Sequence, residues 1–149
     1  MTPSQRLARA KRLVTVQEQM RRVAERDLAA TRRDIASTEA DRAALLQTLA
    51  GERMAGLFLD AAAGRLRRIA ETATALGARA TAQERTVLAR GLSEKQAERW
   101  ADGLARSHRA EEDRRDALEQ LDLLIARGGG GLDDAPTPAS RKPGALSGS

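Results

Sequence analysis

The distribution of proline limits what this chain can fold into. Four prolines occur in 149 residues, and none lies between Pro3 and Pro136. Because a proline in a helix interior costs about 3 kcal/mol relative to alanine, this proline-free stretch permits very long helices. Ser4 can cap the free N–H groups at the start of the first helix. We therefore expect an all-α fold.

Apolar residues recur with helical spacing in both halves of the chain. In the first half they are spaced by 11, which predicts a nearly straight stripe, namely Leu13, Ala24, Ile35 and Leu46, with Val16, Met20, Leu28, Leu45 and Leu49 beside it. From Leu66 the spacing alternates between three and four, which is typical of a coiled coil, in Leu66, Ile69, Ala73, Leu76, Ala80, Gln83 and Val87 and, with interruptions, in Ala97, Ala101, Leu104, Leu118 and Ile125. The chain has one Phe, one Trp and no Tyr, so the core must be thin.

Glycines indicate where two helices are joined. The stretch GERMAGLFLDAAAG, residues 51–64, holds three glycines and an apolar cluster formed by Met54, Leu57, Phe58 and Leu59. Each glycine costs about 1 kcal/mol inside a helix, which favours a turn that the apolar cluster plugs. We expect helices over residues 4–50 and 65–127, with a turn at about 51–64. They form a long antiparallel two-helix coiled-coil hairpin over residues 1–127.

The last 22 residues are typical of a disordered tail. Residues 128–149 begin with four glycines, contain three prolines and show no apolar period. A glycine directly after Arg127 is a good signal for the end of a helix. Such a composition cannot offset the entropy lost on ordering, so we expect the tail to be dispensable for folding.

The residue types argue against an enzyme. The chain has no Cys, which removes thiolate metal sites and thiol nucleophiles. His108 is the only imidazole, and with Glu111 and Glu112 it could hold a divalent ion weakly, but nothing supplies the remaining ligands. A two-helix rod also offers no concave site for catalysis. We expect no catalytic residue, no metal and no cofactor.

No part of the sequence predicts insertion into a membrane. The first residues lack the apolar region of a signal peptide, and no apolar run approaches the roughly 20 residues that a membrane span needs. We therefore expect a cytoplasmic protein.

The first helix carries a basic surface. The net charge of the chain is +5, and this surface comprises Arg6, Arg9, Lys11, Arg12, Arg21, Arg22 and Arg26. It could contact phosphates of nucleic acid or of lipid. Against this, acids are interleaved, for example Glu18 four residues before Arg22, and no aromatic residue accompanies the surface to stack on bases. A nucleic-acid binder stays an alternative.

Trp100 allows two interpretations. In the seam between the helices it would be the largest core side chain, whereas on the outer face it would anchor a partner. The heptad leaves both open, because Trp100 and Ala101 compete for the same inward position.

Residues 4–127 resemble the FliJ and YscO family, the small coiled-coil proteins of flagellar and injectisome type III secretion. The resemblance lies in a basic and apolar first turn that leads to a Gln-Glu pair, Arg6 to Glu18, and in a charged stretch midway along the second helix, Glu94, Lys95 and Glu98. A Leu-Asp run follows at Leu121 and Asp122.

The resemblance implies a non-enzymatic stalk, cytoplasmic and peripheral to the inner membrane at the export apparatus. Its partners would be a hexameric export ATPase, the membrane export gate and export chaperones, with no small-molecule substrate and no nucleic acid. We expect a monomer outside the complex, and we expect partner contacts at Arg9, Lys11, Arg12, Arg21, Lys95, Glu98, Trp100 and His108. The alternatives are a structural scaffold coiled coil that dimerises through the same seam and the basic nucleic-acid binder.

Overall fold

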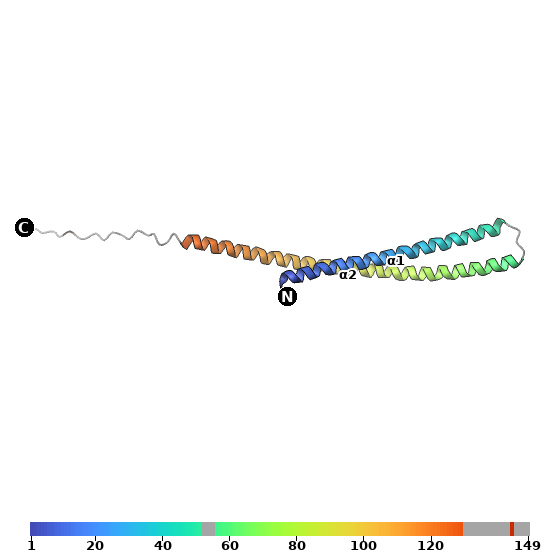
Figure 1. Ribbon diagram of the computed structural model, residues 1–149, viewed down its shortest axis with the longest axis horizontal. Helices are drawn as coiled ribbons and strands as arrows, with labels where there is room; N and C mark the ends of the chain where they lie inside the picture. The colour runs from blue at the N-terminus through green and yellow to red at the C-terminus, as the bar shows by residue number, and fades with distance from the viewer. Residues whose placement is uncertain (52–55, 130–143, 145–149) are drawn as a thin grey trace, which may run out of the picture. The chain divides into compact units, whose positions relative to one another are not determined.

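Two long helices make up the described part of the chain. The computed structural model describes residues 1–51, 56–129 and 144, with helix α1 over Pro3–Gly51 and helix α2 over Gly56–Gly129 (Figure 1). The expected all-α fold, with two long helices packed against each other, is confirmed. The predicted tail falls mostly on residues 130–143 and 145–149, which lie outside the described residues.

The start of α1 is capped by Thr2, one position before Pro3. The Gln5 backbone N–H donates to Thr2 Oγ1 at 3.2 Å, and the Thr2 backbone N–H donates to Gln5 Oε1 at 3.0 Å. This reciprocal pair is a capping box, and Pro3 occupies the first helical position, where its missing N–H has no helical partner to lose. The cap is therefore Thr2 and not Ser4, because only Thr2 has Gln three residues later.

The connection between the helices is shorter than the turn predicted at residues 51–64. Helix α2 already begins at Gly56, so Gly64 lies inside a helix, where the three alanines before it favour helical structure. Phe58 and Leu59 are exposed, so they do not plug the connection. Of the other two members of that cluster, Met54 lies outside the described residues, and the side chain of Leu57 is not described.

Two ion pairs between the helices define their antiparallel register. The chain divides into two compact units, Met1–Arg106 and Ser107–Ser149, and the first unit contains both ion pairs. The guanidinium of Arg21 pairs with Glu94, and Arg32 Nη2 lies 3.1 Å from Glu84 Oε1. A step of 11 residues forward along α1 is thus matched by ten residues back along α2. In Figure 1 the two helices of this unit run side by side in opposite directions.

Both helices turn a heptad seam toward each other. On α1 less exposed residues follow one another by three and four, with one step of seven after Thr38, in Leu7, Ala10, Val14, Gln17, Arg21, Ala24, Leu28, Thr31, Ile35, Thr38, Leu45 and Leu49. On α2 the same steps occur in Ala62, Leu66, Ile69, Leu76, Ala80, Gln83, Val87, Arg90, Glu94, Ala97, Ala101 and Leu104, with one step of seven after Ile69 because Ala73, which was expected in the seam, is exposed. The 11-residue stripe predicted for the first helix is wrong at Leu13 and Leu46, which are exposed. Two helices that pack along a common seam must have the same spacing of inward-facing residues. On α2 this spacing is about 3.5 residues, so the seam of α1 repeats at about 3.5 residues as well.

The core of the hairpin is thin, as predicted. Its buried apolar residues are mostly alanines, with Leu28 the one large side chain among them, in the set Ala10, Ala24, Leu28, Ala80, Ala97 and Ala101. Thr31 is buried as well. Small side chains in a seam let two helix backbones approach closely, but they bury little apolar area.

The final part of α2 belongs to the second unit and is exposed. Every residue from 109 to 129 has an exposed side chain or, for glycine, an exposed backbone. Leu118 and Ile125 were expected in the seam and are exposed, at 60% and 67%. With 49 residues against 74, α1 is too short to cover all of α2. Neither described helix has an apolar stretch long enough to cross a membrane.

Candidate partner-binding site

A groove on the hairpin brings three of the predicted site residues together. Arg9 and Arg12 of α1 and Trp100 of α2 line it. The full lining, which we call the Trp100 groove, is Met1, Arg6, Arg9, Arg12, Leu13, Val16, Trp100 and Leu104. Its lining combines apolar side chains with three arginines.

On α1, most of the side chains that line the groove come directly before a seam residue in the sequence. On α1, Arg6, Arg9, Leu13 and Val16 alternate by three and four, each one residue before a seam position, so they form a stripe beside the seam. The sequence pattern predicts Arg6 only as part of the basic surface and predicts Leu13 in the seam. The shared spacing of these four residues is the signal that could have identified the groove.

The two interpretations of Trp100 are resolved by its neighbour. Ala101 is 8% exposed and occupies the inward position, whereas Trp100 is 47% exposed. An alanine fits where the helices approach closely, and an indole ring would force them apart. Trp100 therefore lies in the groove, half-buried, with one part of its ring available to a partner.

The arginines of the groove have no acidic partner among the residues that the structure describes. Residues 1–17 contain four basic side chains and no Asp or Glu. Among the described residues no carboxylate lies within ion-pair distance of Arg6, Arg9 or Arg12, whereas Arg22 pairs with Glu18 one turn away. The groove thus presents uncompensated positive charge beside an apolar surface.

This arrangement corrects one premise of the sequence analysis. The basic surface was expected to lack an aromatic residue, but the fold places Trp100 in the same groove as Arg9 and Arg12. The two parts are more than 80 residues apart in the chain, so no local pattern reveals their proximity.

Arg21 does not line the groove and is held by carboxylates. Its guanidinium pairs with Glu94 across the hairpin, and its Nη1 lies 2.6 Å from Glu25 Oε1 on the same helix. The hydrogen bond to Glu94, and then that to Glu25, raises the pKa of Arg21 above its ordinary value. Arg21 therefore stabilises the register of the helices.

The remaining predicted residues are not brought into the groove. Lys11, Lys95 and Glu98 are exposed and lie outside its lining. His108 belongs to the second unit, and its Nδ1 lies 3.5 Å from Glu112 Oε1 one turn further along α2. The structure thus gathers Arg9, Arg12 and Trp100 and leaves the other five apart.

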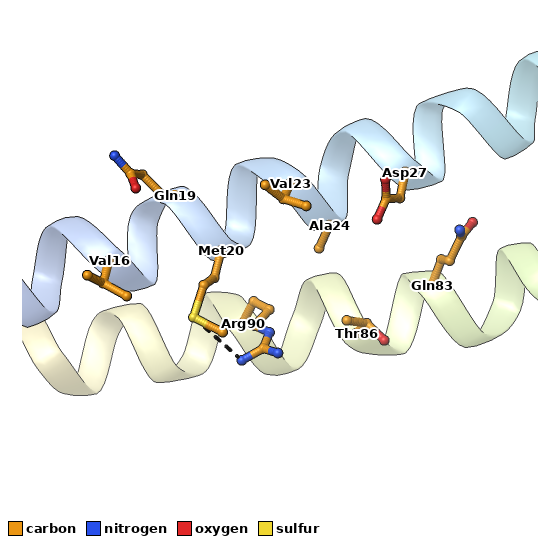
Figure 2. Close-up of a pocket in the computed structure, with 9 residues that line it drawn as sticks. All are labelled: Val16, Gln19, Met20, Val23, Ala24, Asp27, Gln83, Thr86 and Arg90. Atoms are coloured by element: carbon orange, nitrogen blue, oxygen red, sulfur yellow. Dashed lines mark hydrogen bonds between the residues drawn. The ribbon is translucent and has the colours of Figure 1, made fainter.

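A second groove adjoins the first through Val16, which lines both. Figure 2 shows its lining, Val16, Gln19, Met20, Val23, Ala24, Asp27, Gln83, Thr86 and Arg90. Met20 of α1 and Arg90 of α2 point toward each other, with Arg90 Nη1 3.9 Å from Met20 Sδ, a weak hydrogen bond. The apolar surface of the Trp100 groove therefore continues along the hairpin.

The chemistry of the Trp100 groove is that of binding. Its lining contains guanidinium groups and apolar side chains, and Arg cannot be deprotonated in proteins. In the described ranges 1–51 and 56–129 no three His, Cys, Asp or Glu side chains come together to hold a metal ion. An anionic partner with an apolar face is the ligand that this lining fits.

Comparisons of the chain with models of protein families, with curated proteins and with solved structures found no match.

Proposed function

We propose that this protein is a non-enzymatic component of a type III export apparatus, flagellar or injectisome, and that it acts as a stalk engaging a hexameric export ATPase. The observation that carries the proposal is the basic Trp100 groove on a two-helix hairpin. The resemblance of residues 4–127 to the FliJ and YscO family supports it. A long helical hairpin is also the shape that a shaft inside a ring requires.

The mechanism is mechanical and allosteric. A rod whose sides differ makes different contacts with each subunit of a ring, and only such differential contacts can bias subunits between states. Arg9 and Arg12 supply long-range attraction to acidic loops of the ring, and Trp100 supplies the apolar anchor. The same protein contacts the membrane export gate and assists the handover of substrates by export chaperones, on the cytoplasmic side of the inner membrane.

The test is binding of the full chain to the export ATPase of the same organism. Reversing the charge of the groove with Arg9→Glu and Arg12→Glu should weaken binding about tenfold or more, because neither side chain forms an ion pair within residues 1–51 and 56–129. Circular dichroism should be unchanged, since exposed charges contribute little to folding.

A matched control makes the same charge change elsewhere. Arg33 and Arg85 are exposed on α1 and α2, line no described groove and form no ion pair within residues 1–51 and 56–129. The variant Arg33→Glu with Arg85→Glu should bind like the wild type. Equal binding by both variants would show that the groove is not the surface that contacts the ATPase. A wild-type chain that does not bind the ATPase would refute the proposal that the protein is its stalk.

Nucleic-acid binding is the second candidate, and the position of Trp100 beside Arg9 and Arg12 favours it. An aromatic ring stacks on bases while arginines neutralise phosphates. Binding to single-stranded DNA should then fall steeply with salt and weaken further in Trp100→Ala. Retention that is insensitive to salt would exclude this function.

A further inference from the structure

The final part of α2 carries an apolar stripe without a partner in the described structure. Four large side chains spaced by three or four lie exposed on it, and we call them the distal stripe: Leu118, Leu121, Leu124 and Ile125. Exposed apolar residues gathered on one helical face are typical of an interaction site.

Acidic residues precede the distal stripe and lie between its members. Residues 111–122 contain two arginines and six carboxylates, the latter being Glu111, Glu112, Asp113, Asp116, Glu119 and Asp122. Within the described residues of α2, none of these six carboxylates lies within ion-pair distance of an arginine or a lysine. Glu112 alone lies near the imidazole of His108, with Oε1 3.5 Å from Nδ1. This segment therefore presents uncompensated negative charge beside leucines, whereas the Trp100 groove presents uncompensated positive charge beside Trp100 and Leu13.

The two surfaces also agree in length. At about 1.5 Å per residue, Leu118 to Ile125 spans roughly 11 Å of helix, and the α1 side of the groove from Arg6 to Val16 spans roughly 15 Å. The distal stripe is therefore short enough to lie along the groove.

We propose that the Trp100 groove binds the distal stripe of a second copy of this chain. Leucines of one copy cover Trp100, Leu13 and Leu104 of the other, and the carboxylates face Arg9 and Arg12. The inference does not rest on the proposed function. A second copy is the occupant because one chain carries both complementary surfaces, and a reciprocal exchange closes a dimer.

The contact is short, so the dimer is weak and its population depends on concentration. Any other ligand of the groove must displace the second copy. The monomer expected from the sequence is then the form present at low concentration.

The test is sedimentation velocity of the full chain over about two decades of concentration. A monomer–dimer equilibrium that weakens as salt rises is the expected result. Arg9→Glu with Arg12→Glu should raise the dimer dissociation constant about tenfold or more, while Arg33→Glu with Arg85→Glu should leave it unchanged. A chain that stays monomeric throughout, or a dimer that both variants affect equally, overturns the proposal.

Exchanging the charges of the two surfaces tests whether they contact each other directly. Asp113→Arg with Asp122→Arg should weaken the dimer, and a chain that carries these two changes together with Arg9→Glu and Arg12→Glu should recover it. Failure of the four-fold variant to recover, with its helicity intact, would refute pairing of these two surfaces.

Cysteine crosslinking tests the contact without changing charge, because the chain has no cysteine of its own. A Val16→Cys chain mixed with a Leu121→Cys chain should form the mixed disulfide faster than either chain forms a disulfide with itself. No preference for the mixed product would contradict the proposal.

Discussion

Replacing Leu28 with alanine tests whether the heptad seam holds the hairpin together. Leu28 is 7% exposed and is the largest of the buried apolar side chains in the described structure. Truncating a buried leucine costs about 2–5 kcal/mol, the sum of lost transfer free energy and a cavity term. Here the side chain borders an open groove lined by Val87 and Leu88, so the cavity term is small. We expect Leu28→Ala to lower the free energy of unfolding by about 2–3 kcal/mol.

Thermal unfolding followed by circular dichroism measures this loss. At about 4 °C per kcal/mol, the Tm should fall by about 8–12 °C. The matched control is Leu88→Ala, which removes the same atoms at a position that is 70% exposed and lines the same groove. It should change stability by less than about 0.5 kcal/mol. Since helix propensity changes equally in both variants, the difference reports burial alone, and equal losses would refute the assignment of the seam.

Three further variants test particular side chains. Trp100→Ala should cost about 2 kcal/mol in thermal unfolding, roughly half the loss for a fully buried Trp, because the residue is 47% exposed. A loss below about 0.5 kcal/mol would mean that the ring does not pack in the groove. Gly77→Ala should raise stability by up to about 1 kcal/mol, since the added Cβ meets no heavy atom within 4 Å, and a lower denaturant midpoint would contradict this. Gln83→Leu should raise stability by about 1 kcal/mol, because Gln83 Oε1 is buried without a hydrogen-bond partner among the described residues. A lower Tm for this variant would show that the amide is satisfied.

The sequence by itself determined the fold class and most of the second helix. The absence of proline and the heptad from Leu66 to Val87 are local properties, and a helix forms from interactions within a few residues. The sequence also located the connection between the helices near Gly51. The predicted connection was too long, because the free-energy cost of Gly64 inside a helix is small against the helix propensity of the alanines before it.

Only the tertiary structure decided which of several adjacent positions faces the partner helix. Trp100 and Ala101 are equivalent in a periodic pattern, and the closeness of α1 selected Ala101 for the seam. The same constraint placed Leu13 outside the seam. Likewise, Arg21 was one basic residue among several until the fold set it against Glu94, 73 residues away. Arg9 and Arg12, by contrast, line a groove with Trp100 and form no ion pair with any described residue. Periodicity within one helix carries no information on which distant charges and side chains a second helix brings to it, because that depends on the register of the pair.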